Sequence, residues 1–186
     1  PIKSSAASDV YKRQESNLIT TRQGDAAMRH IFIINPAAGK KDQTARIYDM
    51  ADRLRQAHGL ECQCLLTDRP GGATEMAHRL AQTGEALRVY ACGGDGTVHE
   101  VANGLAGFPN AAMTCVPAGT GNDFLKNFGA DIAKFSDAEA LWDGDVFPLD
   151  LIDCNGRYCL TIACNGIDAQ AVSYTHLRAH ETEADL

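Results

Sequence analysis

The sequence has no apolar segment long enough to span a bilayer and no run of basic residues. Of its 186 residues 45% are hydrophobic, but no stretch approaches the roughly 18 consecutive apolar residues that a spanning helix needs. The formal net charge is −7, and without clustered Lys and Arg this acidity argues against nucleic acid as a main partner. The apolar content indicates a folded protein with a buried core.

The cysteines form no C-x-x-C pair, although there are seven of them, and no secretory leader with an apolar core stands near the first residue. We therefore expect reduced, mostly buried thiols in a cytoplasmic protein. Cys62 and Cys64 alternate within a strand-like segment, so they should share one face of that strand.

The two ends of the sequence do not fit the pattern of the rest. Residues 1–14 show no periodicity, and residues 172–186 begin with an equally irregular string. Both resemble translated adaptor sequence of the kind found at the ends of metagenomic fragments. We expect the genuine protein to cover residues 15–171 and its parent chain to continue further. His176 and His180 have the i, i+4 spacing of two metal ligands on a helix, but we expect that spacing to be accidental.

Between these ends, short apolar runs alternate with amphipathic stripes. The pattern predicts strands at 30–34, 61–67, 87–91 and 113–116, and helices at 42–57, 73–81 and 98–105. Strands and helices that alternate through short loops are typical of a parallel sheet covered on both faces. The expected fold class is therefore α/β.

The alternation ends after Ser136. A possible capping box at Ser136 predicts a short helix over 136–142. A strand is expected at 146–153, followed by a two-residue hairpin turn at Asn155-Gly156 and a return strand at 158–163. We therefore expect an α/β domain to give way here to the beginning of a β-rich second domain.

Loops rich in glycine follow the expected parallel strands, at 35–39, 68–72, 93–97 and 117–121. In parallel sheets, ligands bind beyond the carboxyl ends of the strands, so we expect one ligand to touch several of these loops. The loop 93–97 also begins a helix, whose free N–H groups and positive dipole end favour phosphate. Asp95 lies between its glycines, and an acid in that setting suits a bound metal ion or a transferable proton. Together these features indicate phosphoryl chemistry.

Two common phosphate-loop fingerprints do not match. A Walker A loop needs a glycine five residues before Gly39 and a Ser or Thr after Lys40, but Ile34 and Lys41 occupy these positions. The dinucleotide fingerprint G-x-G-x-x-G fails because His99 stands where its third glycine should be.

The loops as a set resemble the diacylglycerol kinase catalytic domain, which bacterial soluble diacylglycerol kinases share with related lipid kinases. The matching motifs are Asn35-Pro36-x-x-Gly39-Lys40, Thr67 before a loop that leads to Ala73, Gly93-Gly94-Asp95-Gly96-Thr97-x-x-Glu100, and Pro117-x-Gly119-Thr120-Gly121-Asn122-Asp123-Phe124. The resemblance covers about residues 30–171, and both order and spacing match. It implies a parallel-sheet nucleotide-binding domain, of the type shared with NAD kinases, and a β-rich second domain, with ATP in the cleft between them.

Carried over position by position, the resemblance implies a set of ATP contacts at the strand ends. These are Asn35, Pro36, Ala37, Ala38, Gly39, Thr67, Gly93, Gly94, Asp95, Gly96, Thr97, Val98, His99 and Thr120. Asp95 would be the catalytic residue that organises Mg²⁺ or the attacking hydroxyl, and Glu100 and Asn122 would brace the loops. The main metal ligands are expected in the second domain, of which the sequence holds only the start.

Simpler interpretations of single residues stay open. Asp95 could be a helix cap, and Asn35-Pro36 could simply end a strand. We expect Lys40 to be solvated, Asp123 to cap the segment that follows it, and His99 to be a packing or surface residue rather than a base.

The resulting hypothesis is a cytoplasmic lipid kinase, peripheral to the membrane when it acts, with ATP, Mg²⁺ and a lipid as partners. It would transfer the γ-phosphate to a lipid hydroxyl, with diacylglycerol as the expected acceptor. We expect residues 15–144 to form the nucleotide-binding domain and residues 145–171 to begin the second, so that the sequence alone would be inactive. Two alternatives remain: a kinase of the NAD kinase type with a soluble acceptor, and a nucleotide-binding fragment without activity. An oligomeric state cannot be read from the residues.

Overall fold

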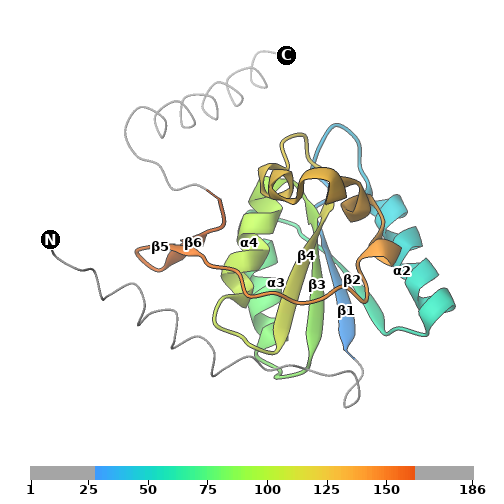
Figure 1. Cartoon of the computed structure of the whole chain (residues 1–186), viewed down its shortest axis with the longest axis horizontal. Helices are drawn as coiled ribbons and strands as arrows, with labels where there is room; N and C mark the ends of the chain where they lie inside the picture. Colours follow the sequence, from blue (N-terminus) through green and yellow to red (C-terminus); the bar gives the residue numbers. More distant parts are fainter. Residues whose placement is uncertain (1–27, 162–186) are drawn as a thin grey trace, which may run out of the picture.

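A computed structural model describes residues 28–161 and builds them around a parallel sheet with helices on both faces (Figure 1). The sheet order is β2-β1-β3-β4. The strands are β1 (Arg29–Ile34), β2 (Cys62–Leu66), β3 (Leu87–Gly93) and β4 (Ala111–Pro117), and the helices are α2 (Thr44–His58), α3 (Gly72–Ala81) and α4 (Asp95–Leu105). All strand pairs in this sheet are parallel, so the expected α/β fold is confirmed.

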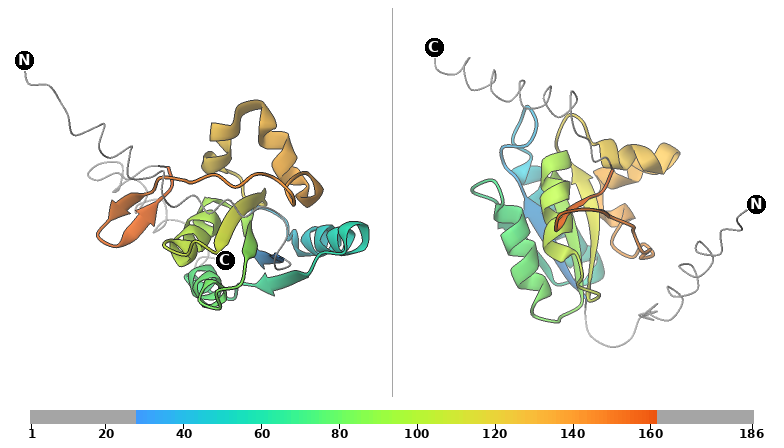
Figure 2. Two further views of the ribbon diagram at one scale, coloured as in Figure 1. Left: turned by 60° about the horizontal axis from the view of Figure 1, so that its bottom comes forward. Right: turned by 90° about the vertical axis from the view of Figure 1, so that its left-hand side faces the viewer.

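Each face of the sheet has its own apolar core. Ile31 and Ile33 on β1 pack with α3 and α4, whereas Phe32 and Ile34 pack with α2 on the opposite face. Figure 2 shows α2 on one side of the sheet and α3 with α4 on the other. Successive side chains of a strand point to opposite faces of the sheet, so alternate residues of β1 contribute to the two cores. All seven residues of β3 are buried, which is why that strand is apolar except for Arg88.

Helix α2 ends at a glycine. Gly59 ends α2 in the left-handed conformation, with φ of 67°, and its N–H donates to the carbonyl of Arg55 at 3.0 Å. In the sheet register, Ile34 at the end of β1 pairs with Leu66 and Cys92 on its two neighbours. The loops that follow these strands therefore begin at nearly the same level.

The described cysteines are free thiols, as expected, but fewer are buried than predicted. Cys92 and Cys115 are buried and Cys154 is exposed, whereas Cys62, Cys64 and Cys159 are half-buried. Cys62 and Cys64 both pack against the α2-side core, which confirms that they share a face. Desolvation raises the pKa of Cys64 to about 11.

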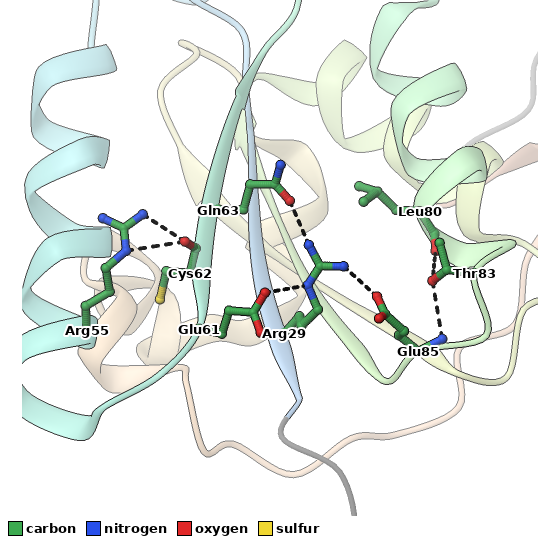
Figure 3. Close-up of polar contacts among 8 residues, drawn as sticks. All are labelled: Arg29, Arg55, Glu61, Cys62, Gln63, Leu80, Thr83 and Glu85. Carbon is green, nitrogen blue, oxygen red and sulfur yellow. Dashed lines mark hydrogen bonds and ion pairs between the residues drawn. The ribbon is translucent and has the colours of Figure 1, made fainter.

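Arg29 holds the amino-terminal edge of the sheet (Figure 3). Its guanidinium lies 2.9 Å from Glu61 and 2.5 Å from Glu85, and it donates to the Gln63 amide oxygen at 2.9 Å. These partners lie on or beside the two strands that flank β1. Partly exposed ion pairs contribute at most about 1 kcal/mol each, so their main effect is to align the three strands.

A buried polar pair lies at the same end of the sheet. The His30 side chain is 2% exposed, and its Nδ1 is 2.9 Å from the Tyr90 hydroxyl. Burial, together with the charge of Arg88, lowers the pKa of His30 to about 4, so the imidazole is neutral in the fold. Arg88 donates to the carbonyls of Leu141 and Gly144, both at 2.7 Å, and thereby fixes the chain where it leaves the sheet layer.

The segment after β4 differs from the sequence expectation. An irregular 3₁₀ helix, η1 (Asp123–Ser136), kinked at Gly129, stands where no helix was predicted. The helix predicted over 136–142 shortens to η2 (Ala138–Ala140), and its cap is Asp137, whose carboxylate accepts the Glu139 N–H at 3.2 Å. The prediction of a Ser136 cap is wrong by one residue, because the neighbouring aspartate is an equally good cap.

The strand predicted at 146–153 is wrong over most of its length. The structure has no strand at residues 145–151, and only β5 (Ile152–Cys154) pairs, antiparallel, with β6 (Arg157–Cys159). The predicted turn at Asn155-Gly156 is confirmed, with φ of 54° and 82°. The apolar side chains at 146, 147 and 149 stay exposed, because no other part of the described chain covers them.

The expectations for both ends of the sequence lie outside the described residues. They concern residues 1–27 and 162–186, and so include the adaptor-like strings, His176 and His180, and the last two residues of the predicted return strand. Within the described residues that strand ends at Cys159, so its prediction over 160–161 is wrong. Within residues 28–161, no helix is both long and apolar enough to cross a membrane.

His30 should make the fold less stable in mild acid. The group titrates near 6.5 when unfolded and near 4 when folded, so the unfolded state gains protons first and stability falls as the pH drops through this window. Between about pH 7 and about pH 5, urea denaturation should show a loss of about 2 kcal/mol from this residue. His30→Gln should lack that loss, whereas His78→Gln, at an exposed site, should keep it. Equal pH dependence in wild type and His30→Gln would contradict the prediction.

Candidate functional site

A cavity of about 340 Å³ opens at the carboxyl ends of β1, β3 and β4. The three loops that follow these strands line it, at the top of the sheet in Figure 1. The lining residues are Asn35, Ala38, Gly39, Gly94, Asp95, Gly96, Thr97, Gly119, Thr120 and Gly121. The motifs that sequence reasoning singled out at 35–39, 93–97 and 117–121 therefore meet in one place.

The loops approach each other so closely that no side chain fits between them. A Cβ atom on Gly119 would lie 2.5 Å from the Cα of Gly94, and one on Gly121 would lie 2.6 Å from Oδ2 of Asp95. Glycine is the residue that permits such backbone contact. The wall of the cavity is consequently made of backbone groups and small side chains.

Asn35 and Thr97 connect the first of these loops to α4. The Asn35 amide donates to the Thr97 hydroxyl at 3.2 Å, while its Oδ1 accepts the Ala37 N–H at 3.0 Å. Thr97 is 5% exposed. Asn35 therefore does more than end β1, because its side chain orders the loop that bounds the cavity.

Asp95 is the first residue of α4 and faces the cavity. Its Oδ1 accepts the N–H of Asp123 at 2.6 Å, at the start of η1. The alternative that Asp95 caps its own helix is wrong, because the N-cap of α4 is Gly94. The Asp95 carboxylate instead binds the first N–H of η1, whose N-cap residue is Asn122. Among the described residues that line this cavity, Asp95 alone is acidic.

One carboxylate is what a metal ion carried on nucleotide phosphates would need. Mg²⁺ keeps several waters and takes one or two protein carboxylates in such sites. In the described part of the chain, no three His, Cys, Asp or Glu side chains gather into a metal cluster. The single carboxylate of Asp95 therefore fits a metal ion whose other ligands are phosphate oxygens and water.

Glu100 and Asn122 make the contacts expected of loop-bracing residues. The Glu100 carboxylate accepts the N–H groups of Gly71 and Ala73, at 2.9 and 3.1 Å, and so caps α3 from the neighbouring helix. The Asn122 amide donates to the carbonyl of Gly119 at 2.9 Å. Each side chain therefore ties a glycine-rich loop to the element beside it.

Several predicted ATP contacts do not line this cavity. Thr67 follows the edge strand β2 and donates its N–H to the Ile34 carbonyl at 2.9 Å, and the loop 68–72 behind it also stays outside. The others that do not line the cavity are Pro36, Ala37, Gly93, Val98 and His99. Their contact with ATP stays a prediction. Lys40 is exposed, as expected of a solvated side chain.

A second, smaller cavity of about 180 Å³ shares Asp95 with the first. Its lining residues are Asp95, Val98, His99, Phe124, Cys159, Leu160 and Thr161. Sequence reasoning missed the last three, because they end or follow the β5–β6 hairpin and carry no local motif. They reach the site because the hairpin lies against α4.

Comparison with known proteins agrees with the geometry. The family model of the diacylglycerol kinase catalytic domain matches residues 29–154. The diacylglycerol kinases of Staphylococcus saprophyticus and Bacillus subtilis are each 35% identical to this chain, over 145 and 139 residues. These alignments cover 77% and 73% of this chain but 46% and 45% of the relatives. The chain therefore spans about half the length of the curated relatives it matches.

A solved structure extends the likeness to three dimensions. The crystal structure of a diacylglycerol kinase from Bacillus anthracis superposes with a TM-score of 0.56 at 28% identity. The superposition covers 73% of this chain and 50% of that one.

Gly119→Ala should destabilise the fold, because the added methyl would lie 2.5 Å from the Cα atom of Gly94. Separating the two loops should cost about 1–3 kcal/mol and lower the midpoint of thermal unfolding by several degrees. Gly96→Ala is the matched control, since a Cβ there meets nothing within 4 Å and the position is helical. It should leave the midpoint unchanged or raise it slightly. Equal midpoints for the two variants would rule out the close packing.

Proposed function

The chain belongs to the diacylglycerol kinase catalytic domain family, and from that membership and the site geometry we propose that the whole protein is an ATP-dependent lipid kinase. Diacylglycerol is the proposed acceptor and phosphatidic acid the product. The observation that carries the proposal is the cavity of backbone groups at three strand ends, with Asp95 as its one acidic lining residue. Two relatives that share this sequence pattern are named diacylglycerol kinase.

The first cavity is the proposed site for the phosphates of ATP. The N-terminus of α4 opens onto it at Asp95, and free N–H groups at a helix start stabilise phosphate oxygens. Asn35 and Thr97 keep the neighbouring loop in place. Mg²⁺ bound to the phosphates and held by Asp95 would supply the charge neutralisation that phosphoryl transfer requires.

The second cavity is the proposed approach for the acceptor hydroxyl. It shares the Asp95 carboxylate with the phosphate site, and Val98, Phe124 and Leu160 give it apolar walls. A carboxylate that accepts a hydrogen bond from the hydroxyl would orient its oxygen toward the γ-phosphorus. The new O–P bond would form as the bond to the β,γ-bridging oxygen breaks, ADP would leave with that electron pair, and the hydroxyl proton would pass to the Asp95 carboxylate.

The proposed setting is the cytoplasmic surface of a membrane, where a lipid acceptor is available. Residues 15–144 would form the nucleotide-binding domain, and residues 145–171 would begin the second domain. We propose that the 186-residue chain binds ATP with Mg²⁺ but does not phosphorylate lipid, because the chain aligns with only 46% of a related kinase.

Asp95→Asn should abolish most activity of the whole protein while leaving its fold intact. The amide oxygen can still accept the Asp123 N–H now bound at 2.6 Å, but it has no charge for a metal ion or an acceptor proton. Turnover should fall about a hundredfold or more, measured as transfer of labelled phosphate from ATP to diacylglycerol in vesicles. Asp131→Asn, at an exposed acid on η1, should keep normal turnover.

Near-normal turnover of Asp95→Asn would reject the role given to this carboxylate. A parallel assay with NAD as the phosphate acceptor tests the alternative that the protein is a kinase of the NAD kinase type. Phosphorylation of NAD without phosphorylation of lipid would replace the lipid kinase proposal with that alternative.

A further inference from the structure

A polar stripe runs down one face of α4, from the cavities toward the β5–β6 hairpin. Asp95, His99 and Asn103 stand four residues apart, a spacing that places side chains on one helix face in successive turns. Asp95 lines both cavities and His99 lines the second. Asn103 lies two turns below Asp95 and lines neither cavity.

The Asn103 amide pairs with the backbone of a strand. Its Nδ2 donates to the Tyr158 carbonyl at 2.8 Å, and its Oδ1 accepts the Tyr158 N–H at 2.9 Å. The same Nδ2 also donates to the carbonyl of His99 at 2.9 Å, one turn earlier in α4. A side chain thus takes the place of a neighbouring strand at the outer edge of β6.

This contact joins the hairpin to α4 by hydrogen bonds, beside the packing of Leu160 on the apolar core. Within residues 28–161, no other hydrogen bond joins the hairpin to α4. The three residues that follow Tyr158, namely Cys159, Leu160 and Thr161, line the second cavity beside Asp95. A shift of Tyr158 along α4 would therefore move one wall of that cavity.

We propose that Asn103 is a positioning residue: it holds residues 158–161 against α4 and so gives the second cavity its closed wall beside Asp95. Where it concerns a hydroxyl-bearing lipid acceptor, the inference rests on the proposed function. Where it concerns the docking of the hairpin, it stands on the hydrogen bonds alone. Removing the amide would leave the N–H and carbonyl of Tyr158 without these partners, which weakens the docking of the hairpin and favours its local opening.

The test on the 186-residue chain is the rate at which iodoacetamide alkylates Cys159, followed by mass spectrometry. Asn103→Asp turns the Nδ2 donor into an oxygen that faces the carbonyls of His99 and Tyr158, and Asn103→Ser is too short to reach Tyr158. We expect either variant to raise the Cys159 rate about fivefold or more. Cys62, half-buried on β2 against the α2-side core, lies outside the hairpin and serves as the internal reference, with an unchanged rate.

Asn110→Asp is the matched control for a purely structural amide. Asn110 Nδ2 also donates to two carbonyls, those of Ala81 at 3.0 Å and Glu85 at 2.8 Å, but far from both cavities. It should lower thermal stability without changing the Cys159 rate. If the Cys159 rate in the Asn103 variants equals that of wild type or of Asn110→Asp, the proposal is overturned.

Kinetic measurements on the whole protein distinguish the positioning role of Asn103 from the proposed lipid kinase activity. In the whole protein, Asn103→Ser should raise KM for diacylglycerol vesicles about tenfold and leave KM for ATP unchanged, whereas Asn110→Asp should change neither. Equal rises in both KM values would overturn the positioning role. A faster Cys159 reaction in a protein whose wild type phosphorylates no lipid would keep the docking role of Asn103 and reject the lipid kinase.

Discussion

The close approach of three backbone loops at the carboxyl end of the sheet is the constraint on which the site depends. Gly119 faces Gly94 across the gap, and a side chain on Gly39 would collide with the Ala118 carbonyl. The sheet order β2-β1-β3-β4 makes the strands before these loops direct neighbours. The site needs both the strand order and the glycines. Adjacent strands bring the loops together, and the absence of side chains at the glycines leaves a space walled by backbone groups, which suits phosphate.

Asp95 connects this space to the rest of the molecule. Its carboxylate accepts the Asp123 N–H, so the residue that faces the first cavity also fixes the start of η1. Phe124 follows immediately and forms part of the second cavity. A single carboxylate at the positive end of α4 thus orders the third loop and stands where the two cavities meet. Asparagine at position 95 would keep the hydrogen bond to Asp123 but lose the negative charge. It therefore distinguishes the structural role of the side chain from its chemical role.

The parallel sheet could be predicted because each strand and helix carries a local signal, such as the uninterrupted apolar residues of β1 from Ile31 to Ile34. The loops of the site could be predicted for the same reason, since each is a contiguous motif. The rest depends on distant partners. The apolar pattern over 146–153 resembles a strand, but a strand needs a neighbour, and residues 145–151 have none in the described chain. Likewise, Asn103 pairs with Tyr158, 55 residues later, and nothing local to Asn103 indicates that contact.

Helix α4 transmits these constraints because neighbouring elements hold it along its length. Asp95 fixes its first turn against η1, Glu100 caps α3, and Gly104 packs so tightly that a Cβ there would lie 2.5 Å from the Thr74 carbonyl oxygen. A site on so constrained a helix keeps its geometry better than one on a free loop. Since α4 cannot follow the hairpin, any displacement of Tyr158 must appear as a change in the second cavity. The amide of Asn103 is therefore the contact through which the β5–β6 hairpin would influence the surroundings of Asp95.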